Sequence, residues 1–178
     1  MKINKALLLL LTLLVGAGLF YLIGGFVLAA VYVLIWIDKI VIINTLKYFG
    51  IELTTMATLM LGIAYGPIAA FIFGIVVIPL LHSMRFVLLP LQQPDWPLFV
   101  PHPNNVVDAL GGAVAGMFAT LPFLYLAVAV TLLKDVGYAL SEGVLLGKPI
   151  NWFSAVMYLL VNALIAYQFG PAITVFIG

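Results

Sequence analysis

Cysteine and charge are what this sequence lacks. None of its 178 residues is a cysteine, and only 7% are charged. The absence of cysteine excludes disulfides, thiolate metal sites and thiol nucleophiles. Soluble domains carry about 25% charged residues, so this chain has too few to cover a surface that faces water. Its net charge of +1 provides no field that would attract nucleic acid, and no motif that reads nucleic acid is present.

Hydrophobic residues are abundant instead. They make up 66% of the chain, and the mean hydropathy is +1.30. A surface that faces lipid needs no polar cover. We therefore predict an all-α integral membrane protein, a compact bundle of about six transmembrane helices that forms a single domain over residues 1–178. It is expected to be a multi-pass protein of the cell membrane, with the lipid bilayer as its immediate partner.

The first apolar run extends from Ala6 to Ile37. This is longer than the core of a signal peptide, so we predict a retained membrane helix. As one straight helix it would be about 48 Å long at 1.5 Å per residue, which exceeds a hydrocarbon core of about 30 Å. The sequence allows a tilted helix, a protruding helix, or a break near Gly24-Gly25 that divides residues 6–46 into two spans.

A glycine-proline step predicts a tight turn after the second segment. Residues 54–65 form a short apolar segment, and Gly66-Pro67 follows it. Proline is well tolerated at the first position of a helix, where its missing N–H would be unpaired. We therefore predict a tight hairpin between the second helix and a third that runs to about Ser83.

Five prolines in the fourteen residues 90–103 predict a long loop. Beyond it, asparagines are expected to cap two of the remaining helices. The predicted caps are Asn104 or Asn105 for the fourth segment and Asn151 for the sixth. The three predicted helices cover residues 106–121, 122–140 and 152–176.

The distribution of positive charge bears on orientation. With six helices, Lys2, Lys5 and the C-terminus share one face, and the positive-inside rule places the opposite face, with five positive residues, in the cytoplasm. A turn at Gly24-Gly25 would instead bring all seven positive residues to one face. The five are Lys39, Lys47, Arg85, Lys134 and Lys148.

Few polar residues are placed to do chemistry. His82, His102, Asp95 and Asp108 are of the types that ligate zinc, but their spacing is not specific, and we predict no metal site, cofactor or catalytic residue. If Asp108 binds no metal or ligand, it is expected to interact with the dipole of the helix in whose first turn it lies. Arg85 either extends its charge toward the interface or contacts a lipid phosphate or another anion.

Asn162 is the polar residue most deeply placed in a predicted span. It lies eleven residues into the sixth helix, where an unpaired amide is costly, so it is expected to face other helices or a cavity. It either holds helices together or orients a ligand. Glu52 and Glu142 lie near helix ends and are expected to be solvated.

Two stretches resemble a known family. Residues 51–80, IELTTMATLMLGIAYGPIAAFIFGIVVIPL, resemble the second and third helices of the substrate-binding (S) components of energy-coupling-factor (ECF) vitamin transporters. Residues 158–171 are similar to the last helix of that family, with Asn162 in its middle and a Gly170-Pro171 step at its end. The resemblance implies a bundle that captures a vitamin-like molecule and docks on a coupling transmembrane protein driven by ATPases. It also implies docking through small residues of the first helix, for which Gly25 and Ala29 are the nearest match.

The chain departs from that family in several ways. The three-alanine pattern of the first helix is missing, the charge bias of the loops is opposite, and the proline-rich loop is unusual. The chain begins Met-Lys, whereas the metal-ion branch of the family begins Met-His. The rod-shape-determining membrane protein family has a similar six-helix form and would imply a scaffold subunit.

We therefore predict a substrate-capturing subunit that binds a small organic nutrient between the later helices. The residues expected to line the site are Asn162, Tyr158, Trp152 and Asp108, with Trp96 and Phe99 as a lid. The alternative is a non-catalytic structural subunit of a larger membrane complex. A third reading, an intramembrane enzyme, would require the two histidines and two aspartates named above to converge.

Overall fold

The computed structural model describes all residues except 1–4, 45–48, 90, 92–93 and 95. Lys2, Lys47 and Asp95 lie outside the described residues. The described chain is helical and contains no strand. Four of its helical stretches are long and apolar enough to cross a membrane: Lys5–Ile40, Thr54–Leu88, Phe123–Leu145 and Trp152–Ile177. The elements are α1 (Lys5–Ile40), η1 (Ile42–Asn44), α2 (Thr54–Leu88), α3 (Pro103–Met117), α4 (Phe123–Ala139), a π-helical turn η3 (Leu140–Leu145) and α5 (Trp152–Ile177).

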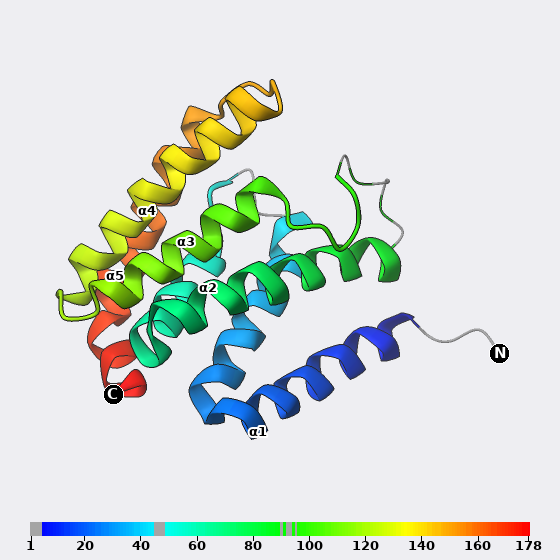
Figure 1. Ribbon diagram of the computed structural model, residues 1–178, viewed down its shortest axis with the longest axis horizontal. Coiled ribbons are helices and arrows are strands. Elements are labelled where there is room, and N and C mark those ends of the chain that lie inside the picture. The colour runs from blue at the N-terminus through cyan, green and yellow to red at the C-terminus, as the bar shows by residue number, and fades with distance from the viewer. Residues whose placement is uncertain (1–4, 45–48, 90, 92–93, 95) are drawn as a thin grey trace.

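Helix α1 folds back on itself at Gly24 and Gly25 (Figure 1). Gly25 has φ 72°, a conformation that favours glycine. The Tyr32 hydroxyl donates to the Thr12 carbonyl at 2.8 Å, and the Trp36 indole donates to the Thr12 hydroxyl at 3.1 Å. In a straight helix, Thr12 and Tyr32 would be about 30 Å apart. The first apolar run is therefore two antiparallel arms rather than one long rod.

Helix α2 is interrupted at Gly66, which has φ 83° and ψ 173°. A Cβ added to Gly112 of α3 would lie 3.3 Å from Thr58 and 3.2 Å from Ala70, one on each side of the break. Both halves of α2 therefore pack against the same part of α3. The structure nevertheless has α2 as one element, and five α-helices in its described part, so the predicted count of six is not reproduced.

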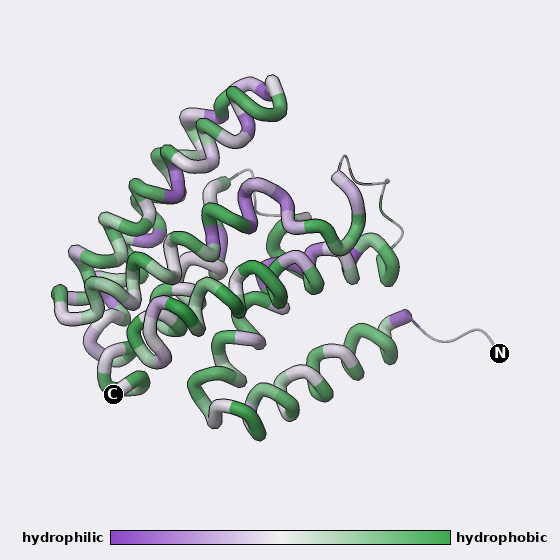
Figure 2. Tube along the Cα trace, viewed as in Figure 1, coloured by the Kyte–Doolittle hydropathy of each residue, from purple (hydrophilic) through white to green (hydrophobic). Residues whose placement is uncertain are grey.

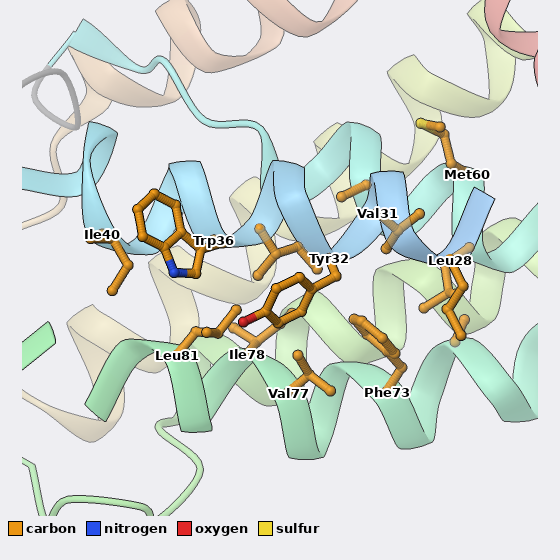
Figure 3. Close-up of a cluster of buried hydrophobic side chains, with 14 residues drawn as sticks. Leu28, Val31, Tyr32, Trp36, Ile40, Met60, Phe73, Val77, Ile78 and Leu81 are labelled. Carbon is orange, nitrogen blue, oxygen red and sulfur yellow. The ribbon is translucent and has the colours of Figure 1, made fainter. Parts of the chain in front are cut away.

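Two hydrophobic clusters hold the elements together. The larger lies between the second arm of α1 and both halves of α2, where Tyr32, Trp36 and Phe73 are among the side chains that interdigitate (Figure 3). The smaller joins α2, α3, α4 and α5 around Leu59 and Leu126. Large apolar side chains elsewhere on α1, α2 and α5 are exposed, as expected of a surface that faces lipid.

The helix caps agree only partly with the sequence. Asn151 caps α5, and its side chain accepts a hydrogen bond from Ser154 N at 3.0 Å, as predicted. Helix α3 is capped by His102 rather than by an asparagine, and its ring nitrogen accepts from Asn104 N at 3.1 Å. Pro103 explains the difference, because proline suits the first helical position and so starts the helix earlier.

The uncharged turns gather at one end of the molecule. The Tyr65 hydroxyl, just before the α2 break, donates to the Gly24 carbonyl in the α1 bend. The end of α5 reaches the same region, where the Phe176 ring lies 5.3 Å from that of Phe26. A Cβ on Gly116, near the end of α3, would contact the backbone of the α2 break. The charged residues of the described chain lie toward the other end, which carries most of the hydrophilic colour in Figure 2.

Candidate functional site

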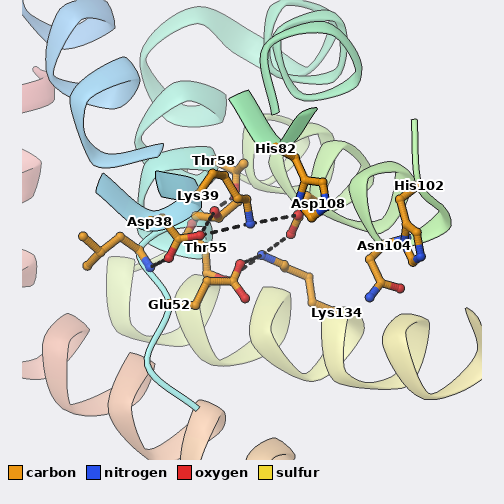
Figure 4. Close-up of polar contacts among 12 residues, drawn as sticks. Asp38, Lys39, Glu52, Thr55, Thr58, His82, His102, Asn104, Asp108 and Lys134 are labelled. Carbon is orange, nitrogen blue, oxygen red and sulfur yellow. Dashed lines mark hydrogen bonds and ion pairs between the residues drawn. The ribbon is translucent and has the colours of Figure 1, made fainter. Parts of the chain in front are cut away.

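Five charged side chains converge at that other end, and we call them the ionic cluster (Figure 4). They come from the end of α1, the segment before α2, α3 and α4. Four are buried, and the fifth, Glu52, has a side chain that is only 20% exposed. Burying charge in a bundle surrounded by lipid is costly unless each charge is paired. The members are Asp38, Lys39, Glu52, Asp108 and Lys134.

Lys134 is the centre of the cluster and is 0% exposed. Its Nζ lies 2.6 Å from Asp108 Oδ1 and 3.4 Å from Glu52 Oε1. It also donates to the Thr55 hydroxyl at 2.6 Å. Three oxygens from three different segments therefore surround one ammonium group, which has three N–H donors.

Lys39 and Asp38 form the second part of the cluster. Lys39 Nζ lies 3.0 Å from Asp38 Oδ2 and 4.0 Å from Asp108 Oδ2. Asp38 also accepts from the Leu53 backbone N–H and from the Thr54 hydroxyl, each at 2.7 Å. This aspartate therefore ties the end of α1 to the start of α2, and Lys39 bridges toward α3.

Two tyrosines border the cluster from α4 and α5. Lys134 Nζ lies 5.6 Å from the centre of the Tyr138 ring and 5.7 Å from that of Tyr158. The Tyr138 hydroxyl donates to Asp108, and the hydroxyls of Tyr158 and Thr55 share a hydrogen bond. The ammonium group thus has two aromatic neighbours in addition to its oxygen partners, an environment that favours cations.

Glu52 is the cluster member outside a helix. Burial by itself raises the pKa of this carboxyl, but the ammonium groups of Lys134 and Lys39 outweigh burial, so the pKa is lowered from its ordinary value of 4.5. Glu52 is therefore a carboxylate at neutral pH. The expectation that it is solvated was wrong, because the segment before α2 turns inward against α4.

Asn162 lies one turn from Tyr158 on the buried face of α5. Its amide nitrogen donates to the Tyr158 carbonyl at 2.9 Å. Its side-chain oxygen is buried and has no hydrogen-bond partner among the residues that the structure describes. The amide therefore faces the interior of the bundle, as the sequence predicted, and its oxygen is available as an acceptor.

The remaining predicted site residues do not join this cluster. Trp152 is 68% exposed at the start of α5, and Phe99 is 55% exposed in the proline-rich loop. Trp96 packs instead against His102, with ring centres 5.3 Å apart. It lines a recess of about 10 Å³ beside α2, together with His82 and Asn105, which is room for about one water molecule.

The residues considered for metal binding each interact with a different part of the chain. His82 lies 3.4 Å from the Arg85 guanidinium, His102 caps α3, and Asp108 binds Lys134. Asp95 lies outside the described residues. Within the described part of the chain, no group of three or more ligand-type residues is placed to hold a metal ion.

The two predicted docking residues lie at and near the α1 bend. Gly25 supplies the positive φ of the turn, and a Cβ there would meet nothing within 4 Å. Ala29 is 9% exposed and counts among the buried residues of the second arm. Ala29 therefore packs against other residues of this chain rather than presenting a surface to a partner.

The pairing of Asp108 with Lys134 is what sequence reasoning missed. From the sequence, Lys134 is only one of the positive residues counted for orientation, and Asp108 is expected to interact with the helix dipole or to line a ligand site. The available signal was that both interrupt apolar runs, since ionisable residues in such segments usually pair with one another. Their separation of 26 positions concealed the contact, because only the packing of α3 on α4 brings them together.

Comparisons with known proteins return nothing that resembles the chain closely. No protein-family model matches it, and neither a curated protein nor a solved structure does.

Proposed function

We propose that this chain is a membrane-embedded subunit that captures a small organic solute, with the ionic cluster and Asn162 as its site. The observation that carries the proposal is a cluster of five charged side chains from four segments, four of them buried, inside a bundle whose outer surface is apolar. Tyr158 and Asp108, which the sequence also singled out, belong to this site.

The physical argument concerns cost. Apolar side chains of similar volume would hold these segments together without the desolvation penalty of buried ions. Charged groups inside membrane bundles therefore commonly mark the path or binding site of a solute. The unpaired oxygen of Asn162 supports the same interpretation, because an orphaned buried acceptor gains free energy when a ligand donates to it.

The family proposed is the S components of ECF transporters, on the resemblance of residues 51–80 and 158–171. In that case the subunit would work with a coupling transmembrane protein and ATPases. We propose that the two arms of α1 and the two halves of α2 act as separate membrane segments. Together with α3, α4 and α5 they would make seven segments, with the tight turn at Gly66-Pro67 between two of them.

The direct test is to purify the protein from its native membrane and identify a bound small molecule by mass spectrometry. We expect a stoichiometric organic solute, and we expect the same compound to raise the melting temperature of protein from which it has been removed. Material that carries no solute and is stabilised by none of a panel of vitamins and amines would refute the proposal.

A variant of Asn162 separates ligand binding from helix packing. Asn162→Leu keeps the number and branching of the side-chain heavy atoms and removes the unpaired oxygen. We expect stable protein that no longer retains the solute, because the ligand loses its acceptor. The matched control is Thr131→Val, since the buried Thr131 hydroxyl donates within α4, to Ala127 O at 2.7 Å. It should retain the solute, and equal loss in both variants would show that Asn162 has no special role.

A structural subunit of a larger complex is the second candidate. The mutual pairing of the charges in the cluster favours it, as does the small size of the recess beside Trp96. Purification under mild conditions discriminates between the two. A stoichiometric assembly that contains no ATPase, together with protein that carries no solute, would establish the structural role.

A further inference from the structure

We infer that the oxygen and aromatic groups around Lys134 form an ammonium-binding cage that the chain fills with its own side chain, and that the captured solute carries an amine which takes the place of Lys134. The inference rests on the proposed function, since it names the chemical class of the solute. The inference assigns a primary ammonium group to the solute and says nothing of the rest of the solute.

The cage is built almost entirely from segments other than the one that carries Lys134. Asp108 comes from α3, Glu52 from the segment before α2, Thr55 from α2 and Tyr158 from α5. Only Tyr138 belongs to α4 itself. These groups therefore keep their positions through their own elements, and the cage persists when the lysine moves.

The composition of the cage selects the sign of its occupant. Two carboxylates and a hydroxyl accept hydrogen bonds from the ammonium, and two tyrosine rings lie within 6 Å of it. Carboxylates and aromatic faces together attract ammonium ions. An anion in the same place would meet two negative charges, and a neutral group would leave them uncompensated.

The lysine stem is the replaceable part. Its Cγ and Cδ lie against Gly111 of α3, where a Cβ would come within 3.2 Å and 3.1 Å of them. A lysine side chain has four rotatable bonds and a compact charge, so rotation about these bonds moves the ammonium group out of the cage. Lys39, on the far side of Asp108, keeps that carboxylate partly neutralised during the exchange.

The experiment empties the cage and offers it a free amine. Lys134→Ala removes three carbons and the ammonium group, which together correspond to n-propylammonium. We expect n-propylammonium to raise the melting temperature of this variant by about 2–4 °C or more at saturating concentration. n-Propanol, which has the same length and no charge, should raise it little. Lys148→Ala removes an exposed lysine and keeps Lys134 in the cage. n-Propylammonium should stabilise it less than it stabilises Lys134→Ala, because the amine must first displace Lys134.

Absence of stabilisation by n-propylammonium, or equal stabilisation by n-propanol, would overturn the cage. Where Lys134→Ala does not accumulate alone, the variant is purified with n-propylammonium present throughout. A several-fold rise in folded yield relative to n-propanol then supports the inference, and no rise overturns it.

The source of the amine is resolved in nanodiscs. Stabilisation of Lys134→Ala by n-propylammonium in phosphatidylglycerol discs supports a soluble solute. Stabilisation only when phosphatidylethanolamine is added identifies a lipid headgroup as the source of the ammonium, and overturns capture of a soluble amine.

The outcome for the solute separates this inference from the proposed function. A co-purified solute without an amine would uphold capture and overturn the ammonium assignment. Rescue by n-propylammonium, combined with wild-type protein that neither carries nor is stabilised by any solute, would uphold the cage and refute capture.

Discussion

At the scale of single residues, the unusual feature is an ammonium group with no exposure to solvent or lipid. Lys134 is stable there because its three donors meet Asp108, Glu52 and Thr55. Removing one partner leaves an uncompensated charge, whereas removing both partners of a pair does not. The cluster is therefore expected to respond to single and paired substitutions in opposite ways.

The variant Asp108→Asn tests this expectation. We expect it to destabilise the protein by about 3–5 kcal/mol, because Lys134 keeps its charge and loses its closest carboxylate. Asp108→Asn combined with Lys134→Met should recover most of that loss. Thermal or denaturant unfolding in detergent measures both. The control is Lys148→Met in an exposed loop, which should change stability by less than about 0.5 kcal/mol. Additive losses in the double variant would contradict the pairing.

The Glu52 carboxylate is expected to make the stability of the protein fall at acidic pH. Its folded pKa is lowered, because Lys134 and Lys39 outweigh burial. A lowered pKa stabilises the fold at pH above the unfolded value of about 4.5, and that stabilisation is lost as the pH falls through the folded value. We expect the melting temperature to decline below about pH 4.5, and to decline less steeply in Glu52→Gln. Parallel curves for the two proteins would contradict this.

At the scale of elements, glycines decide how closely α2 and α3 approach. A Cβ on Gly62 would lie 2.7 Å from the Gly116 backbone nitrogen and would also collide with the Gly112 carbonyl. Backbone cannot move aside as a flexible side chain does. Such contacts between small residues are how membrane helices pack without a hydrophobic drive.

We therefore predict that Gly62→Ala destabilises the protein by about 1–3 kcal/mol, because α2 and α3 must separate. Gly18→Ala is the matched control, since a Cβ at the exposed Gly18 of α1 meets nothing within 4 Å. It should be neutral or stabilising by up to about 1 kcal/mol, through helix propensity. Unfolding measurements on the two variants check the difference, and a similar effect in both would exclude tight packing at Gly62.

At the scale of the whole molecule, charge is sorted to one end. The fold-back of α1 pairs its two arms through Thr12, Tyr32 and Trp36, so the second arm, whose last turn holds Lys39, runs back toward the end that carries Lys5. Arg85 lies in the last turn of α2, Lys134 near the end of α4, and Lys148 in the loop after η3. If the chain turns at Gly24-Gly25, we predict from the positive-inside rule that this end faces the cytoplasm.

Single cysteines test this topology in a chain that has none of its own. Thr120→Cys lies in the uncharged turn between α3 and α4, and Lys148→Cys lies at the charged end. In intact cells, a membrane-impermeant maleimide should label the first and should label the second only after permeabilisation. The reverse pattern would invert the orientation. Labelling of both from the same side would contradict an odd number of crossings between them.

Much of the element structure could be predicted from the sequence. The breaks at Gly24-Gly25 and Gly66, the end of the proline-rich loop and the cap at Asn151 follow from local rules about glycine, proline and asparagine. The starts of α4 and α5 lie within one residue of their predicted positions. The number of helices was less predictable, because a glycine that interrupts a helix does not determine the angle between the two parts on either side of it.

Composition alone requires a lipid environment for this chain, because 7% charged residues cannot cover a surface in water. Local sequence also indicates that Asn162 points inward, since hydrocarbon offers it no partner. Only the tertiary structure joins Asp38 and Lys39 with Glu52, Asp108 and Lys134. Those contacts span up to 82 positions of the chain. They depend on how two bent helices direct the segments after them, which no local pattern encodes.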